Sequence, residues 1–462
     1  MMATRVGRAH AQPHTRAETD TGEPRGSFTG ARADQRTRLL DAVVETVADQ
    51  GYPDAKIAEI ARRAGVSRAT FYELFENKQA CVLEAQAELG ERVGSVIEAA
   101  IETAGCRAAN VAITELVALA ERERSVFDFL THETMLAGRE AQAHRDALIE
   151  RVTRATERAW AGGTGGQDIP ARFLLEGAIR LLSLRMRRDA QDPRPLLVDL
   201  LAWADSYATT DGLTHWRVPA PDPALLARPS RRASILPVHA SLPKGRHRMA
   251  ADVVRGVQRE RICHATAEAV RAKGYAEVTV ADIVSAAGVS RDVFYLQFHD
   301  KDEAFDGAAQ LLFESLLATM AGAFFGDAGE WPDHLWDAGW AFENFLEAEP
   351  SLAHFLFVAT YEPPSRIGRV LDFILVFTLF VEGGNQLRAA EAQVSRSVTE
   401  AIVCAVLEVV NVRVRNERVE ELRGLVPVIT YMVFAPFMGP EAARAFVCAK
   451  VAAERRAADE PS

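Results

Sequence analysis

Two short stretches of the chain carry side chains that suit contacts with nucleic acid. Residues 64–78 read AGVSRATFYELFENK, and residues 287–301 read AGVSRDVFYLQFHDK. In both, an arginine follows a serine, and a tyrosine lies about one helical turn further on. A guanidinium can donate two hydrogen bonds to O6 and N7 of guanine, and a tyrosine hydroxyl suits a phosphate oxygen. The stretches therefore indicate a surface that binds double-stranded DNA, provided that a helix presents them.

The residues around the first stretch predict such a helix. A helix over residues 35–50 is expected to end at Gly51, and a short second helix covers 56–63 before a tight turn at Gly65. Ser67 can cap a third helix by accepting a hydrogen bond from an amide in its first turn. The two phenylalanines of that helix, four residues apart, face inward. A helix, a tight turn and a short exposed helix form a helix-turn-helix, whose last helix can enter a major groove.

The candidate DNA-contacting residues lie on the outer stripe of the third helix and at the starts of its neighbours. They are Lys56, Ser67, Arg68, Ala69, Tyr72 and Lys78 in the first copy and Thr279, Ser290, Arg291, Asp292, Tyr295 and Lys301 in the second. Lys78 and Lys301 open the following helix, where free amides and a cation can hold a phosphate. Thr279 can form a capping-box-like pair with Asp282, whereas Lys56 lacks that cap and offers a positive charge to a phosphate.

The two stretches belong to a longer internal repeat. Laying residues 36–80 over residues 259–303 without gaps gives 18 identities in 45 positions. The offset of 223 residues is too long for a solenoid, whose repeats are roughly 20–50 residues long. It indicates two whole proteins fused in tandem.

Outside the repeat the apolar residues follow a helical period almost throughout, so we expect an all-α fold. The predicted order is a disordered arm (1–34), a first helix-turn-helix domain (35–80), a first helical domain (81–210), a linker rich in Pro and Arg (211–255), a second helix-turn-helix domain (256–303) and a second helical domain (304–456). Lys244, Arg246 and Arg248 lie in the linker next to the second motif. They form either a plain tether or an arm that binds a minor groove or phosphates.

The composition fits a soluble, cytoplasmic protein. The chain has 462 residues, a net charge of −11 and 48% hydrophobic residues, so its overall charge does not favour nucleic acid and local charge must decide. Its five scattered cysteines form no C-x-x-C pair, which fits a reducing compartment. The longest apolar runs, 373–381 and 425–438, are shorter than the ~18–20 residues that span a bilayer. We therefore expect no membrane partner.

Enzymatic motifs do not occur in the sequence. It has no G-x-S-x-G, H-E-x-x-H or G-x-x-x-x-G-K, and the glycines at 162–166 lack a preceding strand, so they indicate a loop. His264 and His354 are isolated in the sequence and have no metal-ligand spacing. We expect neither catalysis nor a cofactor or metal.

Both motifs resemble the DNA-binding domain of the TetR/AcrR family of bacterial transcriptional regulators. The pattern I-A-x-x-A-G-V-S-x-x-x-F-Y-x-x-F-x-x-K is matched at 60–78, and at 283–301 with Val284 in place of the first Ala. The resemblance covers the chain as two family units, apart from the arm and the linker. It implies that an all-helical domain follows each motif, binds an effector and dimerises through its last helices.

The resemblance also implies how the two units work together. Segments 170–208 and 396–438 are expected to pack against each other within one chain, which makes the chain a single-chain pseudo-dimer. We call the third helix of each motif its reading helix. The difference between Ala69 and Asp292 predicts that the two reading helices bind unlike half-sites, so the operator need not be a palindrome. We therefore expect a ligand-responsive repressor that associates with the nucleoid when it binds DNA.

The second helical domain is expected to bind the effector, because it is dense in aromatic residues. They are Phe313, Phe324, Phe325, Trp331, Trp336, Trp340, Phe342, Phe345, Phe355, Phe357 and Tyr361. Most of these serve as core at helical spacing, and the rest are expected to line a pocket for a small apolar or aromatic molecule.

Other functions stay open on the sequence alone. Asp292 repels phosphate but can accept a hydrogen bond from cytosine N4, so the second motif either reads a different base or no longer binds DNA. In the latter case the protein is an interaction or scaffold protein, or a homodimer in which only one motif binds DNA. A homodimer of pseudo-dimers and an activator without a ligand are further alternatives.

Overall fold

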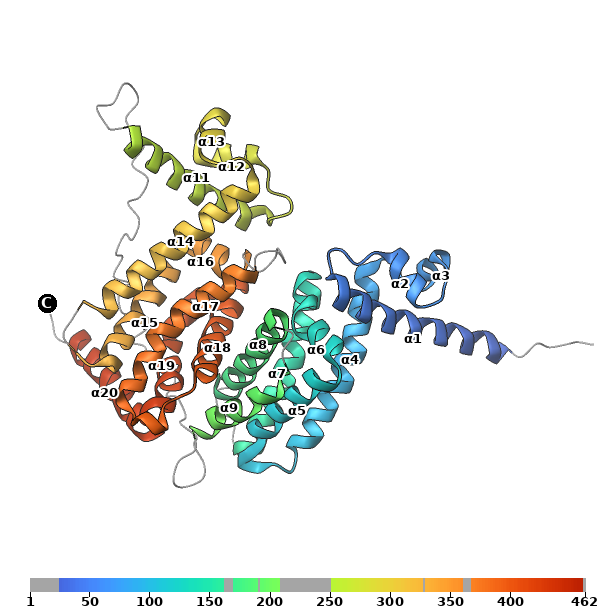
Figure 1. Cartoon of the computed structure of the whole chain (residues 1–462), viewed down its shortest axis with the longest axis horizontal. Helices are drawn as coiled ribbons and strands as arrows, with labels where there is room; N and C mark the ends of the chain where they lie inside the picture. The colour runs from blue at the N-terminus through green and yellow to red at the C-terminus, as the bar shows by residue number, and fades with distance from the viewer. Residues whose placement is uncertain are drawn as a thin grey trace, which may run out of the picture.

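The computed structural model of the chain consists of α-helices joined by turns and short 3₁₀ segments (Figure 1). It describes residues 25–161, 169–189, 192–207, 251–326, 329–359 and 367–459, and no β-strand occurs within these ranges. The predicted all-α class is confirmed. The loop at 162–166 and linker residues 211–250, with Lys244, Arg246 and Arg248, lie outside the described residues.

The first helix-turn-helix unit comprises α1 (Arg25–Gln50), α2 (Ile57–Arg63) and α3 (Arg68–Leu74), and α4 (Lys78–Ile101) follows it. The two turns require left-handed backbone, with φ of 80° at Gly51 and 65° at Gly65. Glycine adopts this conformation without the steric cost that a Cβ atom brings. The apolar face of α1 then packs on α2 and α4.

The start of α1 differs from the sequence prediction. The sequence predicts a disordered arm over residues 1–34, but α1 already begins at Arg25, and residues 1–24 lie outside the described part. The segment 31–36 (ARADQR) favours a helix by intrinsic propensity, although it has no apolar periodicity. Arg32 also donates a hydrogen bond of 3.2 Å to the carbonyl of Glu73 at the end of α3. Helix propensity and this hydrogen bond, rather than burial of apolar side chains, therefore stabilise the first turns of α1.

The second unit repeats the first. It comprises α11 (Ala251–Lys273), α12 (Val280–Ala287) and α13 (Arg291–Gln297), and α14 (Lys301–Phe324) follows it. α11 begins within the segment assigned to the linker, so residues 251–255 are helical. Gly274 and Gly288, with φ of 80° and 60°, occupy the turns that Gly51 and Gly65 occupy in the first unit.

Each unit continues into a bundle of helices. The first bundle contains α5 (Ala108–Arg122), α6 (Arg124–Thr131), α7 (Arg139–Ala161), α8 (Ile169–Asp189) and α9 (Arg194–Asp205). The second contains α15 (Trp331–Ala348), α16 (Pro350–Phe357), α17 (Ile367–Glu382), α18 (Arg396–Arg415), α19 (Leu422–Met438) and α20 (Pro440–Asp459). The two helix-turn-helix units lie apart from each other on the same side of the joined bundles (Figure 1).

Two segments, Lys301–Phe324 and Val419–Met438, are long and apolar enough to cross a bilayer by length and composition. The second segment lies within the second bundle, where 83% of its most apolar window is buried. A helix that other helices surround is apolar on all sides, so burial accounts for this composition.

The two bundles meet where α8 packs along α18, and α9 also contacts α18 (Figure 1). Gly177 on α8 lies at the closest approach. A Cβ atom at this position would lie 2.6 Å from the Trp203 ring, 2.7 Å from the carbonyl oxygen of Ala401 and 2.9 Å from Ala405. Segments 170–208 and 396–438, which the sequence predicts to pack together, are therefore in contact.

A Gly177→Ala substitution should destabilise the junction of the two bundles. The backbone carbonyl of Ala401 cannot move aside as a side-chain tip can, so we expect a loss of about 1–3 kcal/mol in stability. Gly256→Ala is the matched control, because a Cβ atom there meets nothing within 4 Å and alanine favours a helix. Thermal unfolding followed by circular dichroism should give a lower melting temperature for the first variant and an equal or higher one for the second. Equal melting of both variants would contradict the close packing at Gly177.

Candidate nucleic-acid interface and candidate ligand cavity

Serine caps fix the start of each reading helix. Ser67 Oγ accepts a hydrogen bond of 3.0 Å from the Thr70 amide at the start of α3, and Ser290 Oγ accepts one of 3.3 Å from the Val293 amide at the start of α13. The predicted serine cap is confirmed. It leaves the arginine that follows each serine in the first turn, where side chains of a reading helix reach base edges.

The starts of α2 and α12 differ as the sequence predicts. Thr279 and Asp282 form a full capping box, in which each side chain accepts a hydrogen bond from the other residue's amide. Lys56 occupies the corresponding position before α2 and makes no side-chain cap. The Lys56 side chain is exposed, so its charge is available at this edge of the unit.

Two phenylalanines anchor each reading helix and set which stripe faces outward. Phe71 and Phe294 are fully buried, and Phe75 and Phe298 are nearly so. The opposite stripe is exposed, and it contains Arg68, Ala69 and Tyr72 in α3 and Arg291, Asp292 and Tyr295 in α13. The predicted orientation of these side chains is confirmed, and both stripes are open to a partner.

The structure adds one residue that the sequence did not indicate. Leu296 on α13 is 79% exposed, next to Tyr295, whereas the first unit has the acidic Glu73 at the matching position. An exposed leucine suits an apolar contact with a thymine methyl group, and a glutamate does not. The signal was present in the repeat as an acidic-to-apolar change.

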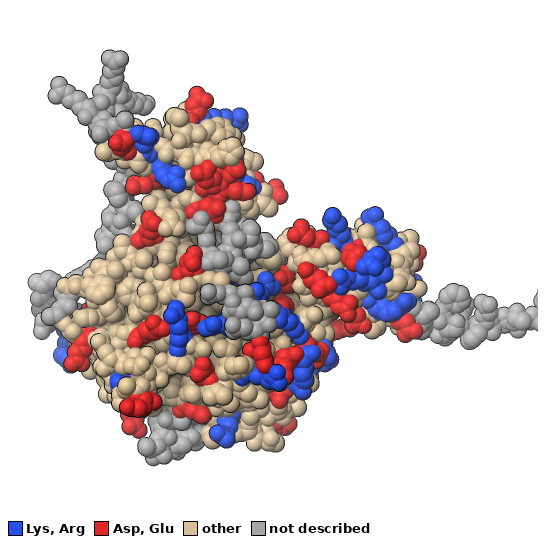
Figure 2. Space-filling model, in the orientation of Figure 1, with Lys and Arg blue, Asp and Glu red and all other residues tan. Residues whose placement is uncertain are grey.

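Figure 2 shows Lys and Arg side chains gathered along the outer edge of the first unit.

Lys78 and Lys301, which are expected to hold a phosphate, make hydrogen bonds to backbone carbonyls of their own units, and their contact with phosphate stays a prediction. Lys78 Nζ donates hydrogen bonds to the carbonyl oxygens of Tyr52 (2.6 Å), Pro53 (3.4 Å) and Ala55 (3.0 Å). The same ammonium lies 4.4 Å from the centre of the Tyr52 ring. An ammonium has three donors, so these carbonyls engage all of them, and Lys78 ties the turn between α1 and α2 to the start of α4.

Lys301 repeats this arrangement in the second unit. Its Nζ donates to the carbonyl oxygens of Tyr275 (3.0 Å) and Ala276 (3.5 Å) and lies 4.7 Å from the centre of the Tyr275 ring. Both lysines therefore connect the first turn of their unit to the start of the following helix. The amides at the starts of α4 and α14 remain the groups there that can bind an anion.

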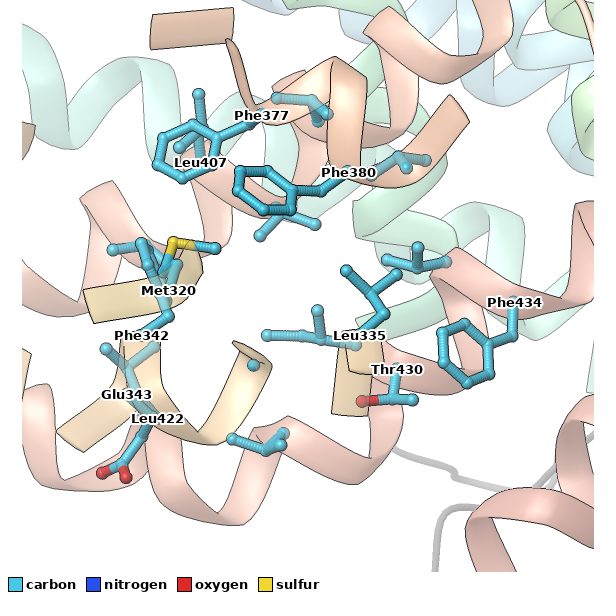
Figure 3. A pocket seen from close by; sticks show the side chains of 18 residues that line it. Met320, Leu335, Phe342, Glu343, Phe377, Phe380, Leu407, Leu422, Thr430 and Phe434 are labelled. Atoms are coloured by element: carbon cyan, nitrogen blue, oxygen red, sulfur yellow. The ribbon is translucent and has the colours of Figure 1, made fainter. Parts of the chain in front are cut away.

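An apolar cavity of about 120 Å³ lies within the second bundle (Figure 3). The residues that line it come from α14, α15, α17, α18 and α19, and include Met320, Leu335, Phe342, Phe377, Phe380, Leu407 and Phe434. Among the described members of the aromatic-rich set named above, Phe342 alone lines it, and buried members such as Trp336 and Phe345 form core. Tyr361 lies outside the described residues. The prediction of a partly aromatic cavity in this bundle agrees with the structure, and its ligand stays a prediction.

Glu343 gives this apolar cavity a charged neighbour. Its carboxylate points away from the open space (Figure 3) and lies 3.5 Å from the Arg423 guanidinium. Burial raises the pKa of Glu343 to about 7, although Arg423 acts in the opposite direction. The stem of the side chain therefore lines the cavity, and burial favours the protonated form of the carboxylate.

The first bundle has a smaller cavity, of about 40 Å³, and a charged side chain lines it. Its wall includes Phe127, Leu148, Ile179 and the buried Arg145. The two bundles are therefore unlike in their interiors, although their helix-turn-helix units are alike.

Comparisons with known proteins agree with this geometry. Residues 39–85 and 262–308 each match the family model described as bacterial regulatory proteins, tetR family. The uncharacterized HTH-type transcriptional regulator YdgC of Bacillus subtilis (strain 168) is 30% identical over 100 residues, which are 22% of this chain and 49% of YdgC. The fatty acid metabolism regulator protein of the same organism is 34% identical over 61 residues, which are 13% of this chain and 30% of that protein.

The curated relatives and solved structures match only parts of the chain. The chain spans about half or less of the length of the curated relatives it matches. Among solved structures, the transcriptional regulator FadR from Bacillus subtilis in complex with stearoyl-CoA is 19% identical with a TM-score of 0.32, covering 36% of this chain and 96% of that chain.

The raised pKa of Glu343 predicts how stability depends on pH. Between the ordinary carboxyl pKa of roughly 4.5 and about 7, the folded protein holds a proton that the unfolded chain releases, so stability falls as pH rises through this window. Glu343→Gln should leave the melting temperature unchanged near pH 5 and raise it at pH 8. The gain at pH 8 corresponds to about 1–3 kcal/mol in the free energy of unfolding. The exposed Glu314→Gln is the control and should change neither value. A Glu343→Gln variant with the same pH dependence as wild type would show that another group titrates.

Proposed function

The chain belongs to the TetR family of bacterial regulatory proteins and carries two family units in tandem, and from this premise we propose that it is a ligand-responsive repressor in which one polypeptide supplies both halves of a pseudo-dimer. Its DNA-binding and regulatory character follows from the family. The pseudo-dimer rests on one observation, the contact of α8 with α18 across the two units.

Polar contacts across this junction support a fixed pairing of the two halves. Tyr207 Oη donates a hydrogen bond of 2.6 Å to the carbonyl oxygen of Met432, and the Trp203 indole N–H donates to Tyr207 Oη at 2.9 Å. Arg185 forms an ion pair of 2.6 Å with Glu400. A fused chain keeps these partners together at an effective concentration of roughly mM, so pairing does not depend on a second molecule.

The differences between the two reading helices support an asymmetric operator. The first presents Ala69 and Glu73 where the second presents Asp292 and Leu296. These residues flank the shared arginine and tyrosine, so base contacts around a common core differ between the half-sites. Two helix-turn-helix units that bind one face of a duplex read half-sites about one helical turn, or 34 Å, apart.

The apolar cavity supports a small uncharged effector. Its lining is almost wholly hydrocarbon, and an engineered apolar cavity of about 150 Å³ binds benzene. A volume of about 120 Å³ therefore suits a ligand of roughly one aromatic ring or a short branched alkyl chain. Larger ligands require the cavity to open.

α18 links the cavity to the junction of the halves. One face of α18 lines the cavity with Val403, Leu407 and Val410, and Ala401 and Ala405 on the same helix lie against Gly177 of α8. A ligand that binds better when α18 is displaced will shift the packing of α18 on α8 and change the separation of the reading helices. The size of that shift is limited by the ligand's differential affinity for the two arrangements.

Arginine substitutions test the two-half-site model. On DNA recovered by in vitro selection with the wild-type chain, Arg68→Ala and Arg291→Ala should each weaken binding by about 1–3 kcal/mol, or roughly 5- to 150-fold, and relax sequence preference in opposite half-sites. Fluorescence anisotropy at fixed salt gives the affinities. Arg122→Ala, an exposed arginine on α5 away from both motifs, is the control.

The mass in solution completes this test. A DNA complex that contains one 50.6 kDa chain fits the pseudo-dimer. If Arg291→Ala binds like wild type while Arg68→Ala fails, only the first motif binds DNA and the asymmetric operator is wrong.

Filling the cavity tests the effector proposal. Gly339 on α15 lines the cavity, and a Cβ atom there meets nothing within 4 Å, so Gly339→Leu projects a side chain into the open space. We expect this variant to bind operator normally and to lose calorimetric binding of a probe such as toluene. Gly322→Leu is the control, because Gly322 is exposed on α14 and its Cβ also meets nothing within 4 Å. Unchanged toluene binding by Gly339→Leu would place the ligand elsewhere.

A further inference from the structure

A second cavity, polar and of about 320 Å³, lies between the two halves. The first half lines it with Asp146, Ala147, Glu150 and Arg172, and the second half with Val412, Arg413, Asn416 and Arg418. Three arginines and two carboxylates therefore face one space, together with the small apolar surfaces of Ala147 and Val412.

Arg413 stands out among these arginines. It is half-buried, and within the described part of the chain no carboxylate lies within ion-pair distance of its guanidinium and no acceptor is hydrogen-bonded to it. Burial lowers the pKa of Arg413, and the neighbouring charge of Arg172 lowers it further. A half-buried guanidinium without a hydrogen-bonded acceptor is partly desolvated, so a ligand that brings negative charge is favoured here.

The two carboxylates of the cavity already have other partners. Asp146 lies 3.3 Å from Arg145 and forms a second ion pair with Arg415. Glu150 lies 2.7 Å from Arg154 and 3.3 Å from Arg172. Each carboxylate is thus shared by two arginines, and the remaining negative charge near Arg413 is that of Glu421, which acts on its pKa in the opposite direction to Arg172.

We propose that this cavity binds a small organic anion whose carboxylate or phosphate group pairs with Arg413. The guanidinium presents parallel N–H donors that match two oxygens of either group. Arg172, which is paired with Glu150 and Glu176, and Arg418, which is paired with Glu421, also line the site. Asn416 lines it too, with an amide that can donate. The volume exceeds that of the apolar cavity in the second bundle, so it leaves room for an organic body beside Ala147 and Val412.

Binding at this place joins the two halves. Arg172 belongs to α8 and Arg413 to α18, the helices that form the junction. An anion held between them ties the helices together and favours one spacing of the halves. The binding step itself needs neither DNA nor the apolar effector, so it stands or fails separately from the repressor proposal.

Calorimetric titration of the full chain with inorganic phosphate and, separately, with citrate tests the proposal. Sodium chloride keeps the ionic strength constant in both arms, and the two probes distinguish a phosphate site from a carboxylate site. We expect saturable binding of at least one probe with one site per chain. Arg413→Gln should weaken it roughly tenfold or more, because a hydrogen-bonded charge is lost. Arg444→Gln, an exposed arginine on α20, should bind like wild type.

Thermal unfolding gives a second readout that separates lost binding from lost folding. Without anion, Arg413→Gln should melt at the same or a higher temperature than wild type, because it removes a half-buried charge that has no ion-pair partner. The probe that binds should raise the melting temperature of wild type and Arg444→Gln but leave that of Arg413→Gln unchanged. Absence of saturable binding of both probes at millimolar concentration, or equal binding by Arg413→Gln and wild type, overturns the proposal.

Discussion

Arg145 is a buried cation whose guanidinium is paired with carboxylates from both halves of the chain. Its guanidinium donates a hydrogen bond of 2.9 Å to Glu176 in its own half and lies 3.4 Å from Glu408 on α18. Burial of both partners raises the cost of leaving either unpaired to several kcal/mol. Burial alone would raise the pKa of Glu408, but Arg145 and other arginines around it lower that pKa, so the carboxylate remains ionised. The Arg145–Glu408 pair therefore joins α7 of the first half to α18 of the second, next to the packing of α8 on α18.

The charges at the junction are complementary between the halves. The first half contributes Arg145 and Arg185, and the second contributes their partners Glu408 and Glu400. In the reverse direction, Asp146 of the first half pairs with Arg415 of the second. The ion pairs between the halves therefore run in both directions, and none of these three pairs places like charges together.

Features set by local sequence could be predicted, and features set by tertiary contact could not. The serine caps, the glycine turns and the inward phenylalanines follow from a few neighbouring residues, and all appear as expected. The direction of the Lys78 side chain does not follow from neighbouring residues, because it depends on a loop that lies 26 residues earlier in the chain. The repeat held a signal for it, since Tyr275 and Lys301 recur with the same spacing as Tyr52 and Lys78. An aromatic residue and a lysine that keep their spacing in both copies indicate a contact within the unit.

Which side chains line the cavities also depends on tertiary contacts. An aromatic-rich stretch predicts an apolar bundle, but which ring faces a cavity depends on helix rotation that the sequence does not specify. Phe342 lines the cavity while Trp336, six residues earlier on the same helix, is buried core. The polar cavity at Arg413 was not predictable at all, because its walls come from α7, α8 and α18, separated by more than two hundred residues of sequence.

The interiors of the two bundles suggest a division of labour that an identical dimer cannot have. In the first bundle, Arg145 lines the small cavity and is committed to the junction. In the second, α18 presents hydrocarbon to a cavity about three times larger and carboxylates to the junction. A ligand in the second bundle therefore contacts the helix that holds Glu408, while the first bundle offers little room for one. In the proposed repressor a single ligand per chain would thus act on both reading helices, because α18, which the ligand contacts, also packs against α8 of the first half.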